Sequence, residues 1–240
     1  MRAKYLMELR KYLNVKNYIA HAKYVFSKQP KTSYAQNGED IIINSALTEY
    51  LGVSKPSYLD IGTYLPVYSN NTYLFYKKGG KGVCVEPDPQ NFKKIKNKRR
   101  RDVCLNVGIG PENAGSVDYY VMSSKYLNTF KKEDADWHVA RGKQKIEQVQ
   151  KVPLVSINSI LEEHFPKGVD ILSIDTEGYD LEILNSLDFI KYSPKLLCVE
   201  TLRYDASGHQ QKVTEIGELL KQKGYELFAD THVNSIFIKI

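Results

Sequence analysis

Two stretches of the sequence decide the fold: Tyr58-Leu59-Asp60-Ile61-Gly62-Thr63-Tyr64 and Val83-Cys84-Val85-Glu86-Pro87-Asp88-Pro89. Each begins as a short apolar run, which is typical of a buried strand, and each ends in a carboxylate followed by a turn. The two acids, Asp60 and Glu86, are 26 residues apart. A parallel sheet binds its ligands at the carboxyl ends of its strands. Both stretches therefore predict a ligand site at one edge of such a sheet.

The same alternation of apolar runs and helical stretches continues to the C-terminus. Strands are predicted at Ser57–Ile61, Gly82–Glu86, Val103–Val107, Ile171–Asp175, Leu196–Glu200, Tyr225–Ala229 and Ile236–Ile240. Helices are predicted at Ile41–Leu51, Asn70–Lys78, Pro89–Arg99, Ile157–His164, Tyr179–Leu187 and Lys212–Lys223. This alternation indicates an α/β fold, a mostly parallel sheet with helices on both faces. The last two strands have no helix between them, so we expect an antiparallel hairpin there.

With 240 residues and 42% hydrophobic residues, the chain has the size and composition of one large globular domain with an added segment. Residues 1–32 are predicted as a basic N-terminal helical segment, because apolar residues recur there at spacings of three and four. Residues 33–240 are predicted as the main domain. Residues 110–156 interrupt its rhythm with one strand, Gly115–Ser123, and a polar stretch, Thr129–Gln150. We interpret them as an insertion, and long insertions are often lids.

The net charge of +6 is unevenly distributed along the chain. Residues 1–31 hold eight Lys or Arg and one acid, so the remainder is close to neutral, and a second basic run covers residues 93–101. Such runs bind nucleic acid or anionic lipid, or are simply solvated, and we favour a solvated arm and a solvated helix end. No nucleic-acid partner is expected, because no aromatic residues are interleaved with the second run. A peripheral membrane contact through the N-terminal segment stays open.

The cysteines and the apolar runs indicate the compartment. Cys84, Cys104 and Cys198 lie in apolar runs without metal-ligand spacing, which favours buried free thiols. No apolar stretch reaches the roughly 20 residues of a membrane span, and the N-terminus lacks the apolar core of a signal peptide. We therefore expect a cytoplasmic protein. The sequence contains no indication of the oligomeric state.

The turn after Asp60 separates two classes of nucleotide cofactor. A dinucleotide needs the pattern Gly-x-Gly-x-x-Gly, whose glycines let the backbone approach a pyrophosphate. Here only Gly62 is present, and positions 64, 65 and 67 are Tyr, Leu and Val. Glu86 ends the second strand, where an acid commonly accepts hydrogen bonds from two ribose hydroxyls. The pattern favours a nucleoside without phosphates, such as S-adenosylmethionine, over a nicotinamide cofactor.

Further acids end two later strands. Asp175 and Glu177 follow the run Ile171–Ile174, and Glu200 ends the run Leu196–Val199. Asp175 and Glu177 fit general acid–base chemistry, a metal site or a helix N-cap, and the residues alone leave these alternatives open. Acids gathered at one sheet edge are costly to bury unless they bind a cationic or hydroxyl-rich ligand. A sulfonium nucleoside is both.

Several motifs, spread in order from Ser33 to the C-terminus, together resemble the FkbM-type methyltransferases. They are Gln36-Asn37-Gly38-Glu39-Asp40, Leu59-Asp60-Ile61-Gly62, Val85-Glu86-Pro87-Asp88-Pro89, Asn106-Val107-Gly108-Ile109-Gly110, Val152–Leu161, Ser173–Gly178 and Cys198-Val199-Glu200. The sequence departs from the family at two places. Thr63-Tyr64 stands where many members carry Ala-Asn, and Thr176 stands where the family often has Val.

The resemblance implies a class I methyltransferase fold, which is Rossmann-like with seven strands, and S-adenosylmethionine as cofactor. It implies cofactor contacts from the Asp60–Gly62 turn, from Glu86 to the ribose and from Asn106-Val107 near the adenine. The expected cofactor-binding residues are Gln36, Asp60, Gly62, Tyr64, Asn70, Glu86, Pro87, Asn106, Val107 and Asp175. The departure at Tyr64 affects the methionine end of that site.

The expected reaction is O-methylation of a hydroxyl on a sugar or glycan-type acceptor of a capsule, a lipopolysaccharide or a secondary metabolite. Asp175 and Glu177 are the first candidates for the base, with Glu200 next, and no required metal is expected. His138 lies in the insertion and is expected to be exposed rather than catalytic. The alternatives are a nucleic-acid methyltransferase that uses the basic segments, and a non-catalytic binding protein on the same fold. A nicotinamide oxidoreductase is disfavoured by the missing glycines.

Overall fold

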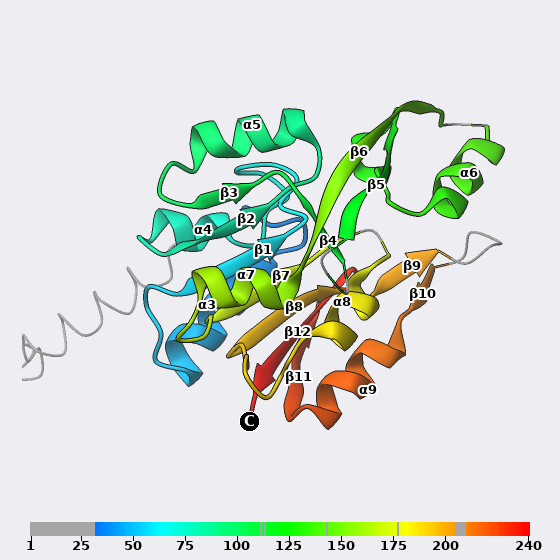
Figure 1. The fold of residues 1–240 in the computed structure, drawn as a ribbon. Coiled ribbons are helices and arrows are strands. Elements are labelled where there is room, and N and C mark those ends of the chain that lie inside the picture. The colour runs from blue at the N-terminus through cyan, green and yellow to red at the C-terminus, as the bar shows by residue number, and fades with distance from the viewer. Residues whose placement is uncertain (1–31, 111, 113, 143, 177, 205–209) are drawn as a thin grey trace, which may run out of the picture. The chain divides into compact units, whose positions relative to one another are not determined.

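The central sheet of the domain has seven strands in the order β11-β12-β8-β7-β1-β2-β3 (Figure 1). The computed structural model describes residues 32–240 apart from 111, 113, 143, 177 and 205–209, so the predicted segment 1–31 lies outside the described residues. Residues 33–240 form one compact unit. The strands are β1 (Ser57–Ile61), β2 (Lys81–Val85), β3 (Val103–Leu105), β7 (Ile171–Ile174), β8 (Leu196–Glu200), β11 (Tyr225–Asp230) and β12 (Asn234–Lys239).

Only one strand of this sheet is reversed. The β12 strand is antiparallel to both β8 and β11, whereas the pairs from β8 through β7, β1 and β2 to β3 are parallel. The α/β class, the mostly parallel seven-stranded sheet and the C-terminal antiparallel hairpin are therefore confirmed. Parallel pairing brings the carboxyl ends of β1, β2, β7 and β8 to one edge.

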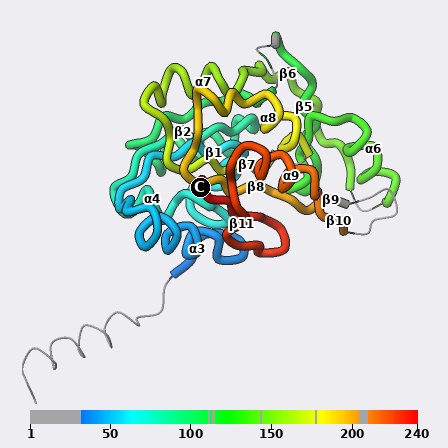
Figure 2. The backbone as a smooth tube through the Cα atoms, turned by 90° about the horizontal axis from the view of Figure 1, so that it is seen from below, coloured from blue at the N-terminus to red at the C-terminus, as the bar shows by residue number. Residues whose placement is uncertain are grey.

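Helices cover both faces of the sheet (Figures 1 and 2). They are α3 (Glu39–Ser45), which continues as the π-helix η1 (Ala46–Tyr50), α4 (Tyr73–Lys77), α5 (Pro89–Lys98), α7 (Ile157–His164), α8 (Asp180–Ser186) and α9 (Thr214–Gln222). On one face, Ile43 of α3 and Phe75 of α4 pack with Tyr58 of β1. On the other face, α7, α8 and α9 pack against alternate strand residues such as Leu59 and Leu172. The sheet is thus buried on both sides, as its continuous apolar runs predict.

A second, three-stranded sheet carries the insertion, which we call the lid. It has the order β4-β6-β5 and comprises β4 (Gly108–Gly110), β5 (Ala114–Met122), β6 (Ile146–Ser156), the 3₁₀ helix η2 (Lys125–Leu127) and the helix α6 (Lys132–Ala140). No helix or strand was predicted within the polar stretch Thr129–Gln150, but it contains α6 and the start of β6. The first part of β6, residues 146–151, is exposed or half-buried and mostly polar, so it lacks the apolar alternation that identifies a strand. A short hairpin of β9 (Leu202–Tyr204) and β10 (Gln210–Lys212) completes the described elements.

Several predicted elements are shorter than expected, and side chains explain two of them. The Asn70 amide oxygen accepts hydrogen bonds from the backbone N–H groups of Thr72 and Tyr73, so α4 begins at Tyr73 rather than at residue 70. The Asn106 amide donates to the carbonyls of Glu86 and Pro87, so the strand predicted to reach Val107 ends at Leu105. The three cysteines are free, with Cys84 and Cys198 buried and Cys104 half-buried.

A buried charge cluster lies beneath the carboxyl edge of β1. Arg99, fully buried at the end of α5, donates from Nε to the Asp102 carboxylate at 2.8 Å and lies 3.6 Å from the Asp60 carboxylate. Asp60 also accepts a hydrogen bond from the Thr72 hydroxyl at 2.7 Å. The Tyr58 hydroxyl donates to Asp102 at 2.8 Å. One cation therefore compensates two buried carboxylates and ties α5 to β1.

Removing that cation should destabilise the domain strongly. We expect Arg99→Leu to lower the free energy of unfolding by about 3–5 kcal/mol, because two carboxylates remain buried without a counter-ion. Arg100, the exposed neighbour of Arg99, provides a matched control. We expect Arg100→Gln to change the free energy of unfolding by less than about 0.5 kcal/mol. Urea denaturation followed by circular dichroism measures both. A loss below about 1 kcal/mol for Arg99→Leu contradicts the proposed role of the cluster.

Candidate active site

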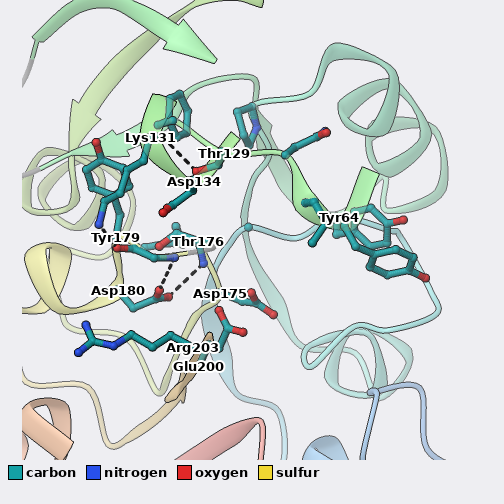
Figure 3. A pocket seen from close by; sticks show the side chains of 18 of the residues that line it. Tyr64, Thr129, Lys131, Asp134, Asp175, Thr176, Tyr179, Asp180, Glu200 and Arg203 are labelled. Carbon is teal, nitrogen blue, oxygen red and sulfur yellow. Dashed lines mark hydrogen bonds between the residues drawn. The ribbon is translucent and has the colours of Figure 1, made fainter. Parts of the chain in front are cut away.

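A cavity of about 1080 Å³ opens at the carboxyl ends of β1, β2, β7 and β8, between the sheet and the lid. Ligand pockets commonly measure about 300–1,000 Å³, so this one has room for a cofactor and an acceptor together. Its sheet side includes Gly62, Glu86, Asp175 and Glu200, and its lid side runs from Tyr119 to His138. Figure 3 shows the Asp175 side chain near the middle of the view, with Glu200 below it and Asp134 of the lid above it.

The turn after β1 requires a glycine. Gly62 has a φ of +78°, and a Cβ there would lie 1.7 Å from the Asp175 carbonyl oxygen. The Asp175 N–H donates to the Ile61 carbonyl at 3.0 Å, and the Gly62 N–H donates to the Val85 carbonyl at 3.0 Å. The exits of β1, β2 and β7 are thus joined through their backbones. The single glycine of the motif serves this close packing.

Glu86 lies at the exit of β2 and lines the cavity. Its two carboxylate oxygens accept hydrogen bonds from the backbone N–H groups of Tyr64 at 2.8 Å and Asp88 at 2.9 Å. Burial raises the pKa of Glu86 to about 8, although these two hydrogen bonds lower it. Each carboxylate oxygen keeps a second lone pair. Glu86 is therefore held in place with acceptor capacity left for a ligand.

Tyr64 reaches this position through strained backbone. Its φ of +55° lies in the left-handed region, which is uncommon for a residue with a side chain. The strain is compensated by the hydrogen bond to Glu86 and by ring contact with Tyr126 of the lid, at 4.6 Å between centroids. Tyr64, which departs from the family pattern, thus provides an aromatic contact between the turn after β1 and the lid.

Three residues that were predicted to contact the cofactor do not line the cavity. Asp60 and Asn70 are buried in the Arg99 cluster, where the Asn70 amide donates to Asp60 and its oxygen accepts from Arg99. Asn106 supports the β2 turn through its bonds to the carbonyls of Glu86 and Pro87. None of these three side chains lines the cavity, where they were expected to contact the cofactor. The other predicted residues, Gln36, Gly62, Tyr64, Glu86, Pro87, Val107 and Asp175, do line it.

The acids next to Gln36 hold its segment in place. The buried Glu39 carboxylate accepts from the Asn37 N–H at 2.8 Å, and from the Thr231 hydroxyl at 2.6 Å. Asp40 accepts from the Ser33 hydroxyl at 2.6 Å. The first of these bonds to Glu39 closes the local turn, and the second joins the segment to the connection between β11 and β12. Gln36 is thereby presented to the cavity.

Asp175 is a further acid in the cavity with a raised pKa. Burial and the negative charges of Asp180, Asp60 and Glu39 raise the pKa of Asp175 to about 7. No hydrogen-bond donor contacts its carboxylate within the described part of the chain. Its neighbour Asp180 instead organises the loop, accepting from the N–H groups of Thr176 at 3.0 Å and Gly178 at 3.3 Å. The N-cap of α8 is Tyr179, whose side chain makes no capping hydrogen bond, so the described residues do not support the helix-cap alternative for Asp175.

Of the two other predicted acids, Glu200 lines the cavity at the end of β8, and Glu177 lies outside the described residues. No group of three or more His, Cys, Asp or Glu among the described residues could hold a metal ion. No helix within the same described ranges is long and apolar enough to cross a membrane.

The lid is fastened to the loop after β7. The Lys131 ammonium donates to the Gly178 carbonyl and to Glu182 at 3.2 Å, and it lies 4.6 Å from the centre of the Tyr179 ring (Figure 3). The α6 helix then presents Asp134, Trp137 and His138 to the cavity at the spacing of one helix face. His138 is half-buried there, and burial lowers its pKa, so the expectation of an exposed histidine is wrong. The spacing of Asp134, Trp137 and His138 was the available signal, and it was missed because no helix was predicted in this polar part of the insertion.

Comparison with known proteins identifies the family. Residues 60–227 match the methyltransferase FkbM domain, which is more than half of the chain. The chain therefore belongs to the FkbM family of S-adenosylmethionine-dependent methyltransferases, and S-adenosylmethionine is its cofactor. A search with the whole sequence found no match among curated proteins.

Solved structures with a similar fold are also methyltransferases. A TehB-like S-adenosylmethionine-dependent methyltransferase from Corynebacterium glutamicum is 12% identical, with a TM-score of 0.43, over 94% of this chain and 97% of that one. A precorrin-6y C5,15-methyltransferase from Geobacter metallireducens is 11% identical, with a TM-score of 0.44, over 89% and 95%. A 1,6-didemethyltoxoflavin-N1-methyltransferase from Burkholderia thailandensis, solved with S-adenosylhomocysteine, is 11% identical, with a TM-score of 0.40, over 98% and 88%.

The cavity fits such a cofactor chemically. Glu86 offers buried acceptors for a diol, and Asp175 adds a second carboxylate that attracts a cationic ligand. The same carboxylates would repel a pyrophosphate, and the β1 turn has one glycine where a phosphate cradle needs several. The residues that line the cavity therefore suit a cationic nucleoside.

Glu86 supplies a direct test of the cofactor site. We expect Glu86→Gln to weaken S-adenosylhomocysteine binding by about 10- to 100-fold, because an NH2 group replaces one acceptor oxygen and opposes the backbone donor that faces it. Isothermal titration calorimetry measures the dissociation constant. Glu226→Gln, at an exposed position on β11, is the matched control and should bind like the parent. An unchanged affinity for Glu86→Gln would remove Glu86 from the cofactor site.

Proposed function

We propose that this methyltransferase transfers the methyl group to a hydroxyl of a sugar or glycan-type acceptor, and that it acts in the cytoplasm. The acceptors we have in view belong to capsules, lipopolysaccharides or secondary metabolites. The Asp175 carboxylate carries the proposal. It lines the cavity, no described donor holds it, and its pKa of about 7 suits a general base near neutral pH.

In the proposed reaction, Asp175 accepts the proton of the acceptor hydroxyl. The cofactor supplies an activated methyl group on a sulfonium centre. When bound, the cofactor would give its methyl carbon to the acceptor oxygen, and its sulfur would keep the electron pair of the broken carbon–sulfur bond. The hydroxyl proton ends on the carboxylate of Asp175, so charge and atoms balance. Glu200, at the end of the adjacent strand β8, is the second candidate for this base.

The lid side of the cavity favours a ring that carries hydroxyls. Trp137 and Tyr179 offer flat apolar surfaces, and Asp134 and Glu133 offer carboxylate acceptors. Sugars have an apolar ring face and a polar rim, so this combination suits them. Burial raises the pKa of Asp134, and the nearby Lys131 opposes that effect. A closed lid would also exclude water from the reacting atoms.

A panel of acceptors tests the reaction class. The protein is incubated with methyl-labelled S-adenosylmethionine and with nucleotide-sugars, capsular and lipopolysaccharide glycans, transfer RNA and a small phenol. Mass spectrometry then locates the label. We expect the label on a hydroxyl of one of the sugar-containing acceptors. Transfer to RNA alone would favour the nucleic-acid alternative, and S-adenosylhomocysteine binding without any transfer would favour a binding protein.

The base is tested with the acceptor that the panel identifies. We expect Asp175→Asn to lower kcat by about 10²–10⁴-fold while S-adenosylhomocysteine binding changes less than about threefold. For the parent, kcat should rise with pH and level off above about 7, because only the ionised carboxylate accepts a proton. Asp134→Asn is the matched control at the lid and should retain that pH profile. The range from pH 5.5 to 8.5 covers about 1.5 units on either side of the expected pKa. If the kcat of the parent does not change over this range, Asp175 is not the base.

A further inference from the structure

Basic side chains gather at the sheet edge opposite the cavity. They lie where α4 and α5 end and where β1 and β2 begin, whereas the lid elements lie at the other end of the domain (Figures 1 and 2). We define the basic face by seven exposed residues: Lys55, Lys77, Lys78, Lys81, Lys98, Arg100 and Arg101. The basic face thus combines the end of the run at residues 93–101 with Lys55, with Lys77 and Lys78, and with Lys81.

Direct contacts make this face continuous. The Arg101 guanidinium lies 3.9 Å from the centre of the Tyr76 ring in α4 and donates to the Tyr76 carbonyl. The Tyr76 hydroxyl donates to the Lys98 carbonyl at 3.4 Å. The Lys55 side chain packs at Gly79, directly after Lys78. The end of α4, the end of α5 and the entry to β1 therefore form one surface.

This surface has almost no compensating negative charge. Residues 71–110 contain ten Lys or Arg and only three acids, Glu86, Asp88 and Asp102. The side chains of all three acids are buried, and Arg99 pairs with Asp102. No carboxylate in the described residues forms an ion pair with any member of the basic face, and Lys77 and Lys78 contact only the neutral Tyr34 and Asn44. Its cations are available to an external polyanion.

We infer that the basic face docks the protein on an anionic lipid membrane. Five of its seven members are lysines, whose flexible point charges suit a diffuse charged surface better than the shaped recognition of bases. The cavity lies at the opposite edge of the sheet, so a nucleic acid held on this face would not be delivered to the reacting atoms. A membrane on this face leaves the mouth of the cavity accessible.

Vesicle sedimentation tests the docking surface with the full chain, residues 1–31 included. The probes are phosphatidylcholine vesicles with and without about 30% phosphatidylserine, in about 0.1 M salt. We expect the parent to bind only the anionic vesicles. The triple variant Lys81→Gln, Lys98→Gln and Arg100→Gln should bind them at least about tenfold more weakly. Its S-adenosylhomocysteine affinity should match the parent, which shows that it is folded.

A charge-matched control separates this face from net charge alone. The variant Lys145→Gln, Lys167→Gln and Lys221→Gln removes three exposed lysines elsewhere and should bind within about twofold of the parent. An equal loss in both variants overturns the inference, as does equal binding of the parent to neutral and anionic vesicles. A short DNA duplex is a further probe. Tighter binding to the duplex than to the anionic vesicles, lost in the first variant, would assign the face to nucleic acid instead.

Discussion

The site depends on a backbone contact that no side chain makes. Gly62 lies so close to the Asp175 carbonyl that a Cβ there would overlap the oxygen, and the Gly62 N–H is bound by the β2 strand. This packing holds the exits of three strands together. The Tyr64 backbone N–H donates a hydrogen bond to the Glu86 carboxylate, and Glu86 and Asp175 line the same cavity. The cofactor contact and the candidate base therefore come from one junction, and a change at Gly62 would disturb both.

Charge is distributed unequally around that junction. Asp60 is compensated by Arg99, whereas the buried Glu86 and the half-buried Asp175 pair with no cation among the described residues and have raised pKa values of about 8 and about 7. The native state therefore binds protons that the unfolded chain releases. The stability that these two groups contribute is fully present below their unfolded pKa values, near 4, and is lost as the pH rises through 7 to 8. Glu86 and Asp175 therefore contribute least to the free energy of unfolding at the pH at which the proposed base is ionised.

Sequence patterns predicted the central sheet better than the lid. Runs such as Leu196–Glu200 are buried on both faces, so their apolar residues identify them, and the predicted bounds of β1, β8 and α7 match the structure. The first part of the lid strand β6 is exposed or half-buried on both faces, so its residues follow no apolar pattern. At the site, strand-end position predicted that Glu86 and Asp175 would share a cavity. It did not predict that Asp60 faces the other side, because that depends on Arg99, which is distant in sequence.

The reversed strand β12 has a consequence for how the chain acquires its fold during synthesis. The β11 strand pairs only with β12 in the described sheet, and β12 also covers the edge of β8. Until β12 leaves the ribosome, β8 presents an open edge of apolar residues to the cell. Nascent chains halted before residue 234 would therefore expose an unpaired strand that can pair with other polypeptides. Chaperone binding would be most needed at this stage of synthesis.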